Sequence, residues 1–67
     1  MTFAQYLEQV MINKKNNPQR RLGQAYFNTL YAFRDDLSEL VRGDTSLDPF
    51  YKDENLPTFL TWVCVNW

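Results

Sequence analysis

Three prolines divide this chain of 67 residues into short segments. Each proline comes one or two residues after a side chain that can cap a helix, namely Asn17, Asp48 or Asn55. Proline has no amide hydrogen to donate inside a helix, but it fits the first helical turn well. The prolines are therefore predicted to separate helical segments. Within the stretch "LDPFYKDENLP", Leu47 to Pro57, the segment "DPFYK" is expected to form one helical turn between two longer elements.

Apolar residues before the first proline recur at helical spacing. They fall at i, i+3, i+4, i+7 and i+8, and they are Phe3, Tyr6, Leu7, Val10 and Met11. Such a stripe is typical of an amphipathic helix. Thr2 and Gln5 lie three residues apart and match a capping box. Together these features predict a first helix over about residues 2–12.

A second stripe predicts a helix that begins at Pro18, with Asn17 as its cap, and runs to Arg34. Its apolar positions are Leu22, Ala25, Tyr26, Leu30 and Phe33, widened by Phe27 and Tyr31. Gly23 inside this helix costs roughly 1 kcal/mol relative to alanine. We expect a close helix–helix approach at Gly23 to offset that cost.

Two shorter helices complete the prediction. The third follows a break at Arg34–Asp36, is capped by Asp35 or Asp36, and ends at Gly43. Its apolar residues are Leu37, Leu40 and Val41. The fourth helix follows Asn55 as its cap. Its stripe is Phe59, Leu60, Val63 and Trp67, with Trp62 beside it.

The aromatic content is high enough to build a core in so short a chain. There are five phenylalanines, four tyrosines and two tryptophans, and each buried ring removes roughly 150–250 Å² from water. Phe50 and Tyr51 are expected to pin the Leu47–Pro57 stretch to this core. A strand in "TWVCVNW" would have no partner to pair with. We therefore predict an all-α single domain over residues 1–67, built as a bundle of three to four short helices.

Cys64 is the only cysteine, and histidine is absent. No internal disulfide can form, and a transition-metal site lacks the ligands that it needs. We expect Cys64 to be a small buried hydrophobe in a cytoplasmic protein. No stretch approaches the ~18 apolar residues of a membrane-spanning helix, so no membrane association is expected.

The carboxylates form no recognisable catalytic pattern. Asp35 and Asp36 are neighbours in sequence, so they point in different directions on a helix. The other clustered acids are Asp44, Asp48, Asp53 and Glu54. Their spacing does not match a calcium loop. Since a phosphate loop and a nucleophile beside a base are also missing, we predict no enzyme, no metal site and no cofactor.

A basic cluster is the feature that favours nucleic-acid binding. Its members lie within eight residues and are Lys14, Lys15, Arg20 and Arg21. Cations at the start of a helix suit phosphate. The net charge of −1 and the acidic third helix, "DDLSEL", oppose this interpretation. A solvated basic loop is the simpler explanation, and nucleic acid is the alternative partner.

The aromatic residues favour protein recognition, because tyrosine and tryptophan are enriched at binding hot spots. The candidate contact residues are Tyr31, Tyr51, Trp62 and Trp67, with Arg20 and Arg21 as charges at the rim. The simpler explanation for each aromatic is a place in the core or at its edge. A third hypothesis is a structural protein that buries its spare aromatics in a homo-oligomer.

Three stretches from Arg20 onward carry a wider pattern: "RRLGQAYFNTL", "RDDLSELVRG" and "LDPFYKDENLPTFLTWV". The pattern residues are Arg21, Gly23, Gln24, Phe27, Asn28, Asp48, Pro49, Phe50, Tyr51, Asp53, Leu56 and Pro57. Over about two thirds of its length, the chain resembles a family of small uncharacterised proteins of tailed bacteriophages and some bacteria. Asp-Pro-Phe-Tyr is the most specific part of the resemblance. Asp35 departs from the family, which often has proline there.

The resemblance implies a phage accessory protein in the cytoplasm of a bacterial host, and it implies no catalytic activity. The aromatic excess and the missing catalytic groups agree with a protein that works by binding. Our hypothesis is that it binds a host or phage protein, and that it inhibits or redirects a host factor.

Overall fold

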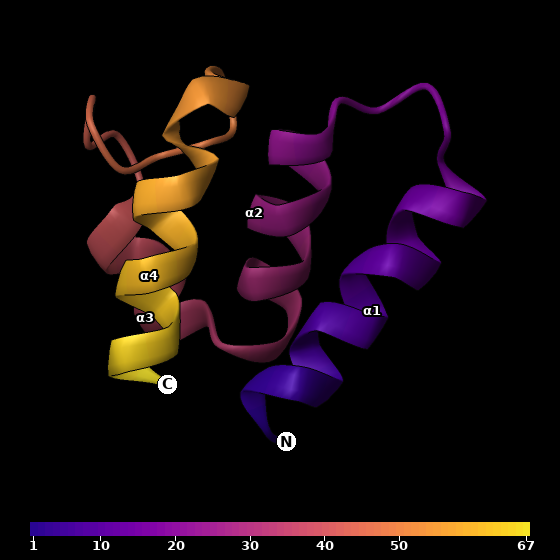
Figure 1. Cartoon of the computed structure of the whole chain (residues 1–67), viewed down its shortest axis with the longest axis horizontal. Coiled ribbons are helices and arrows are strands. Elements are labelled where there is room, and N and C mark those ends of the chain that lie inside the picture. The colour runs from indigo at the N-terminus through magenta and orange to yellow at the C-terminus, as the bar shows by residue number, and fades with distance from the viewer.

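The computed structural model describes all 67 residues and contains four α-helices, one 3₁₀ turn and no strand. The elements are α1 (Phe3–Asn16), α2 (Leu22–Phe33), α3 (Asp35–Val41), η1 (Asp53–Asn55) and α4 (Leu56–Asn66). In Figure 1, α2 lies between α1 and α4, α3 lies behind α4, and both chain ends are at the lower edge. The prediction of an all-α fold is confirmed.

The start of α1 follows the predicted capping box. The Thr2 hydroxyl accepts from the Gln5 amide at 3.1 Å, and the Gln5 side chain accepts from the Thr2 amide at 2.8 Å. The helix continues beyond the predicted end and stops at Asn16. Lysines at positions 14 and 15 favour this extension, because cations in the last turn stabilise the helix dipole.

Asn17 ends α1 and does not begin α2, so the prediction of a cap at Asn17 was wrong. Its backbone amide and its side-chain amide both donate to the carbonyl of Asn13, each at 3.0 Å. The Lys14 ammonium donates to the carbonyls of Pro18 and Arg20. These carbonyls are thus bound by a side chain from α1, and the chain forms a turn here in place of a helix.

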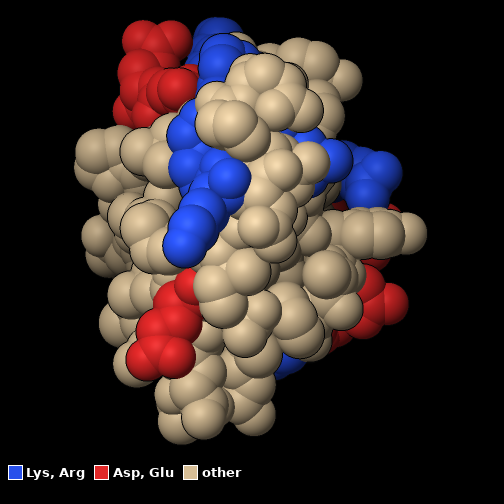
Figure 2. All heavy atoms as spheres, turned by 90° about the vertical axis from the view of Figure 1, so that its right-hand side faces the viewer, with Lys and Arg blue, Asp and Glu red and all other residues tan.

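α2 begins at Leu22, with Arg21 as the flanking residue. The Gln24 side chain accepts from the Arg21 amide at 3.2 Å, which satisfies one of the free donors at the helix start. Figure 2 views the molecule from the α1 side, and basic side chains gather in its upper part, where α1 leads into α2.

The chain breaks between α2 and α3 at Arg34, as predicted, but no aspartate side chain caps α3. The Asp36 carboxylate instead forms a bidentate pair with the Arg34 guanidinium, with N–O distances of 3.1 and 3.0 Å. This ion pair holds the pKa of Asp36 below its ordinary value. Gly43 follows α3 with a φ of +79°, a conformation that glycine adopts without strain.

The core draws on every α-helix and on the connection before α4. Its fully or nearly buried apolar residues are Tyr6, Val10, Ala25, Phe27, Leu30, Leu37, Val41, Leu47, Phe59 and Val63. Part of the predicted α2 stripe lies outside it, because Leu22 and Phe33 are exposed. Leu40 of α3 is also exposed, at 67%.

Candidate functional site

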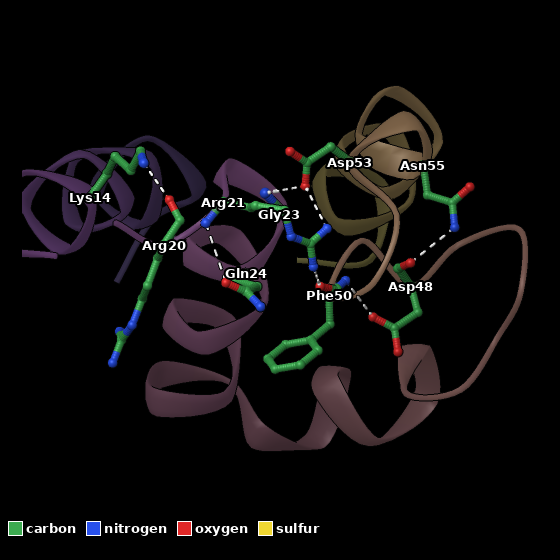
Figure 3. A network of polar contacts seen from close by, with 9 residues as sticks. All are labelled: Lys14, Arg20, Arg21, Gly23, Gln24, Asp48, Phe50, Asp53 and Asn55. Atoms are coloured by element: carbon green, nitrogen blue, oxygen red, sulfur yellow. Dashed lines mark hydrogen bonds and ion pairs between the residues drawn. The ribbon is translucent and has the colours of Figure 1, made fainter. Parts of the chain in front are cut away.

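The connection between α3 and α4 is organised around the buried carboxylate of Asp48 (Figure 3). One carboxylate oxygen accepts from the Gly43 amide at 2.9 Å, and the other accepts from the Phe50 amide at 2.8 Å. The Asn55 amide donates to the carbonyls of Asp48 and Thr45, at 2.9 and 3.0 Å. These bonds fold the stretch into a closed loop.

Two predictions about this stretch were wrong. "DPFYK" contains no helical turn, because the Asp48 carboxylate binds the amide of Phe50 and holds the chain in a bend. Asn55 flanks α4 but forms no side-chain cap, since its side-chain amide is used to close the loop behind it. The same residue types that cap helices also close loops.

The loop is fastened to the first turn of α2 (Figure 3). Arg21 donates to the Phe50 carbonyl and pairs with Asp53 at 3.5 Å. The Gly23 amide donates to the same Asp53 carboxylate at 2.9 Å. A Cβ atom at Gly23 would lie 2.1 Å from the Pro49 carbonyl oxygen. The predicted close approach at Gly23 therefore exists, but its partner is this loop and not a second helix.

The loop presents Tyr51 to solvent at the edge of an aromatic surface. Phe50 packs edge-on against Phe27, with ring centroids 5.8 Å apart, and it fixes the loop to the core. Tyr51 packs against Phe50 at 4.8 Å and is 78% exposed. The prediction that Tyr51 would also pin the loop was wrong, because its ring lies outside the core.

Arg42 lies beside the second exposed tyrosine, Tyr31. Its guanidinium lies 5.5 Å from the Tyr31 ring and 5.7 Å from the Phe27 ring, within the range of cation–π contacts. A hollow of about 200 Å³ lies between Arg42, Tyr51, Phe27, Phe50 and Asp48. We name the surface of Phe27, Tyr31, Arg42, Phe50 and Tyr51 the tyrosine–arginine patch.

The patch brings together two of the four predicted contact aromatics and adds a residue that the sequence did not single out. Tyr31 is 54% exposed. Arg42 was missed because its position before Gly43 marks only a helix end, and the aromatic rings that flank it come from other elements. Its one ion pair, to Glu39 at 3.5 Å, is solvent-exposed.

The other two predicted aromatics lie elsewhere. Trp67 is half-buried and its ring packs against Phe3 and Tyr6, at 6.2 and 5.2 Å. Its indole N–H donates to the Met1 carbonyl at 2.8 Å, and Arg34 lies 5.0 Å from the ring. Trp67 therefore ties the two ends of the chain together. Trp62 is half-buried on the flank of α4.

An apolar groove of about 420 Å³ runs between α1 and α4. It is lined by Phe3, Leu7, Tyr26, Leu60, Thr61, Cys64 and Val65, and we name these seven residues the apolar groove. Tyr26, which is half-buried, is the one lining residue that comes from α2. Cys64 is exposed on the α4 wall, so the prediction of a buried cysteine was wrong.

The basic cluster is largely engaged within the chain. Lys14 binds two carbonyls, and Arg21 binds the Phe50 carbonyl and Asp53. Arg20 donates to the Asn13 side chain at 3.4 Å. At the start of α2, the Asp53 carboxylate occupies an amide that a phosphate would otherwise bind. Lys15 is exposed in the last turn of α1.

Asp44 holds the turn that follows α3. The Asp44 carboxylate accepts from the amide and the hydroxyl of Ser46, at 3.0 and 2.9 Å, and these bonds lower its pKa. No group of three or more histidine, cysteine, aspartate or glutamate side chains is placed to hold a metal ion. None of the helices is both long enough and apolar enough to cross a membrane.

Comparison of this chain with protein-family models, with curated proteins and with solved structures gives no match.

Proposed function

We propose that this chain is a small accessory protein that works by binding another protein through the tyrosine–arginine patch. The observation that carries the proposal is the placement of two exposed tyrosines around one arginine, on a surface built from three separate segments. Tyrosine and arginine are among the residues that dominate the energy of protein interfaces. Within the patch, Arg42 lies over the buried ring of Phe27.

The patch is held in shape before any partner arrives. Arg42 is stacked against Tyr31 and Phe27, and Tyr51 is positioned by the loop that Asp48 closes. Ordering a free side chain at an interface costs about 0.5–1.5 kcal/mol. A patch whose side chains are already ordered loses less of this free energy on binding. This favours a binding role over a merely solvated surface.

The sequence pattern supports a proposal on the kind of partner and on where the two proteins meet. Asp-Pro-Phe-Tyr, the most specific element of the resemblance to small phage proteins, is the segment that presents Tyr51. We therefore place the partner among the proteins of a bacterial host, in its cytoplasm. In this proposal the chain inhibits or redirects that host factor, and it carries out no catalysis of its own.

The test compares variants in affinity capture from nuclease-treated bacterial lysate, with quantitation by mass spectrometry. The tagged wild type is expected to recover one host protein in near-stoichiometric amount. Tyr51→Ala and Tyr31→Ala should each reduce that recovery, by roughly tenfold or more for a hot-spot residue. Met11→Ala is the control, because Met11 is similarly exposed and lies on α1, outside the patch.

Equal recovery by the wild type and both tyrosine variants would overturn the proposal, and so would the absence of any partner. Recovery of nucleic acid alone, lost after nuclease treatment, would point instead to the basic cluster of Lys14, Lys15, Arg20 and Arg21. That outcome should weaken steeply with salt, since phosphate contacts release counterions.

A further inference from the structure

Arg42 is the arginine whose side-chain donors the fold leaves free. The other three arginines each donate a hydrogen bond to a carbonyl or side-chain oxygen of this chain. The only polar contact of the Arg42 side chain is the ion pair with Glu39 at 3.5 Å, and both side chains of that pair are more than half exposed. An exposed pair of this kind contributes little free energy. The guanidinium can therefore exchange Glu39 for another acceptor at small cost.

The guanidinium is nevertheless held in place by aromatic rings. It lies over the Tyr31 and Phe27 rings, 5.5 and 5.7 Å from their centroids. The N–H donors of a guanidinium point outward in its own plane, so contact with a ring face leaves them able to bind an acceptor. Arg42 thus has a restrained position and a set of donors without a hydrogen-bond partner.

We propose that Arg42 binds an acidic side chain, aspartate or glutamate, of the partner protein, an inference that rests on the binding role of the tyrosine–arginine patch. The hollow of about 200 Å³ that Arg42 lines would receive this side chain. A carboxylate matches the guanidinium because its two oxygens can accept two parallel N–H bonds at once. The shape of both groups then fixes the orientation of the partner as well as the contact itself.

The acid already present in this hollow is occupied by other partners. Asp48 also lines the hollow, but its two oxygens accept the Gly43 and Phe50 amides, and no ion pair joins it to Arg42. Bonds from two amides stabilise the charge of that carboxylate where it lies. The other lining residues are aromatic and carry no charge. An acceptor for Arg42 in this hollow must therefore come from outside the chain.

The exposed tyrosines favour a side chain on a partner surface over the end of a chain. Tyr31 contacts Arg42 and Tyr51 lines the hollow, and both rings are more than half exposed. A surface that covers both rings can direct one of its side chains into the hollow at the same time. Rings that exclude water around a charge pair strengthen it. The tyrosines would then supply contact area, and Arg42 would select the charge of the partner.

Nuclear magnetic resonance of the isotope-labelled full chain, at constant ionic strength, tests the proposal with N-acetylglutamate α-methylamide as the probe. This molecule carries an acidic side chain and no other charge. The Nε–H signal of Arg42 is expected to shift and to saturate, with a dissociation constant on the order of 10 mM. N-acetylglutamine α-methylamide has nearly the same shape without the charge and should cause no shift. The Nε–H signals of the other three arginines are the internal control, because those side chains are engaged within the chain.

Two variants distinguish a carboxylate site from a general effect on the surface. Arg42→Gln should abolish the saturable shift, read at the backbone amide of Tyr51, because it removes both the charge and the planar set of donors. Glu39→Gln should tighten binding by up to about fivefold, since it removes the acid that competes for Arg42. A packing role of Arg42 alone would not give opposite effects at these two positions. Circular dichroism of both variants should show the wild-type helix content, since both side chains are largely exposed.

Equal shifts with the glutamate and glutamine probes, or no saturable shift at Arg42, would overturn the proposal. Tighter binding of N-acetylglycine, whose carboxylate is terminal, would overturn the assignment to a side chain. In capture from lysate, loss of the partner by Tyr31→Ala and Tyr51→Ala but not by Arg42→Gln would also refute this site and leave the binding role intact. Equal recovery by the wild type and all three variants would instead refute the binding role on which the site rests.

Discussion

At the scale of single residues, Gly23 lets the backbone of Pro49 lie against helix α2. The space for a methyl group is absent there, since its carbon would lie 2.1 Å from the Pro49 oxygen and 2.5 Å from the Asp53 carboxylate. Its amide also donates to that carboxylate. Glycine thus makes the helix less stable than alanine would, but it permits the contact that holds the loop to α2.

Gly23→Ala should lower the free energy of unfolding, by roughly 1–3 kcal/mol, although alanine is the better helix former. The reason is that the backbone of the loop must move away to admit the Cβ atom. Urea unfolding measures the change. Ala32→Gly, at an exposed position of α2, is the control and should cost about 1 kcal/mol by propensity alone. A Gly23→Ala variant that is more stable than the wild type would contradict the prediction, because it would show that the loop moves away from Cβ without loss of stability.

Tyr6 is the residue whose ionisation the fold opposes most directly. Its ring is fully buried and its hydroxyl donates to the Tyr26 carbonyl at 2.7 Å. Burial, and to a lesser extent the nearby Tyr26, raises the pKa of Tyr6 above its ordinary value of 10.0. The unfolded chain therefore loses this proton at lower pH than the folded chain. Stability from this group is complete below pH 10 and falls as the pH rises further.

Tyr6→Phe should remove this pH dependence. At neutral pH we expect a loss of about 0.5–1.5 kcal/mol, the usual value of one hydrogen bond. Above pH 10, its free energy of unfolding should fall less steeply than that of the wild type, by up to about 1.4 kcal/mol per pH unit. Urea unfolding at pH 7 measures the loss of stability, and urea unfolding at several pH values above 10 measures the slope. An unchanged slope in Tyr6→Phe would contradict the prediction.

At the scale of elements, signals that depend on neighbouring residues could be predicted from the sequence. Hydrogen bonds between a helix end and a more distant part of the chain could not. The Thr2–Gln5 capping box and the break at Arg34 are confirmed, because both depend on neighbours in sequence. Asn17 was wrongly assigned to the start of α2, since only the folded chain shows Lys14 bound to the carbonyls beyond it.

At the candidate site, too, some features could be predicted from the sequence and others depend on distant contacts. Tyr31 and Tyr51 are exposed, although a place in the core or at its edge was the simpler expectation for each. Arg42 could not be found from the sequence, because its cation–π contacts depend on rings that approach from α2. The half-burial of Trp67 follows from packing against Phe3 and Tyr6 at the other end of the chain. Sequence spacing carries no information on such pairs until the helix directions are known.

The loop between α3 and α4 depends on both oxygens of Asp48, and Asp48→Asn tests this. An asparagine keeps one acceptor and turns an NH₂ group towards either the Gly43 or the Phe50 amide. The expected loss is roughly 1–3 kcal/mol, the cost of a buried donor without a partner. Amide exchange at Gly43 and Phe50 should accelerate more than elsewhere.

Asp44→Asn is the matched control for that experiment. A single oxygen of Asp44 accepts both bonds from Ser46, so an asparagine can replace it. The side chain is exposed, and its variant should lie within about 0.5 kcal/mol of the wild type. Equal effects at positions 44 and 48 would show that lost charge, and not lost geometry, determines the stability of the loop.

At the scale of the whole molecule, the tyrosine–arginine patch and the apolar groove use different residues. The patch is built from α2, the end of α3 and the loop, whereas the groove is lined by residues of α1, α2 and α4.

The hydrogen bond from the Trp67 indole to the Met1 carbonyl has a consequence for how the chain can be connected. Since the side chain of the last residue reaches the first residue, a short peptide could join the two ends at little entropic cost. The ring could then be opened between Pro18 and Gln19, which are both exposed. Such a circular permutant would run α2, α3, η1, α4, α1 and keep every helix–helix contact of the original. The spatial order of the helices is thus separable from their order in the polypeptide.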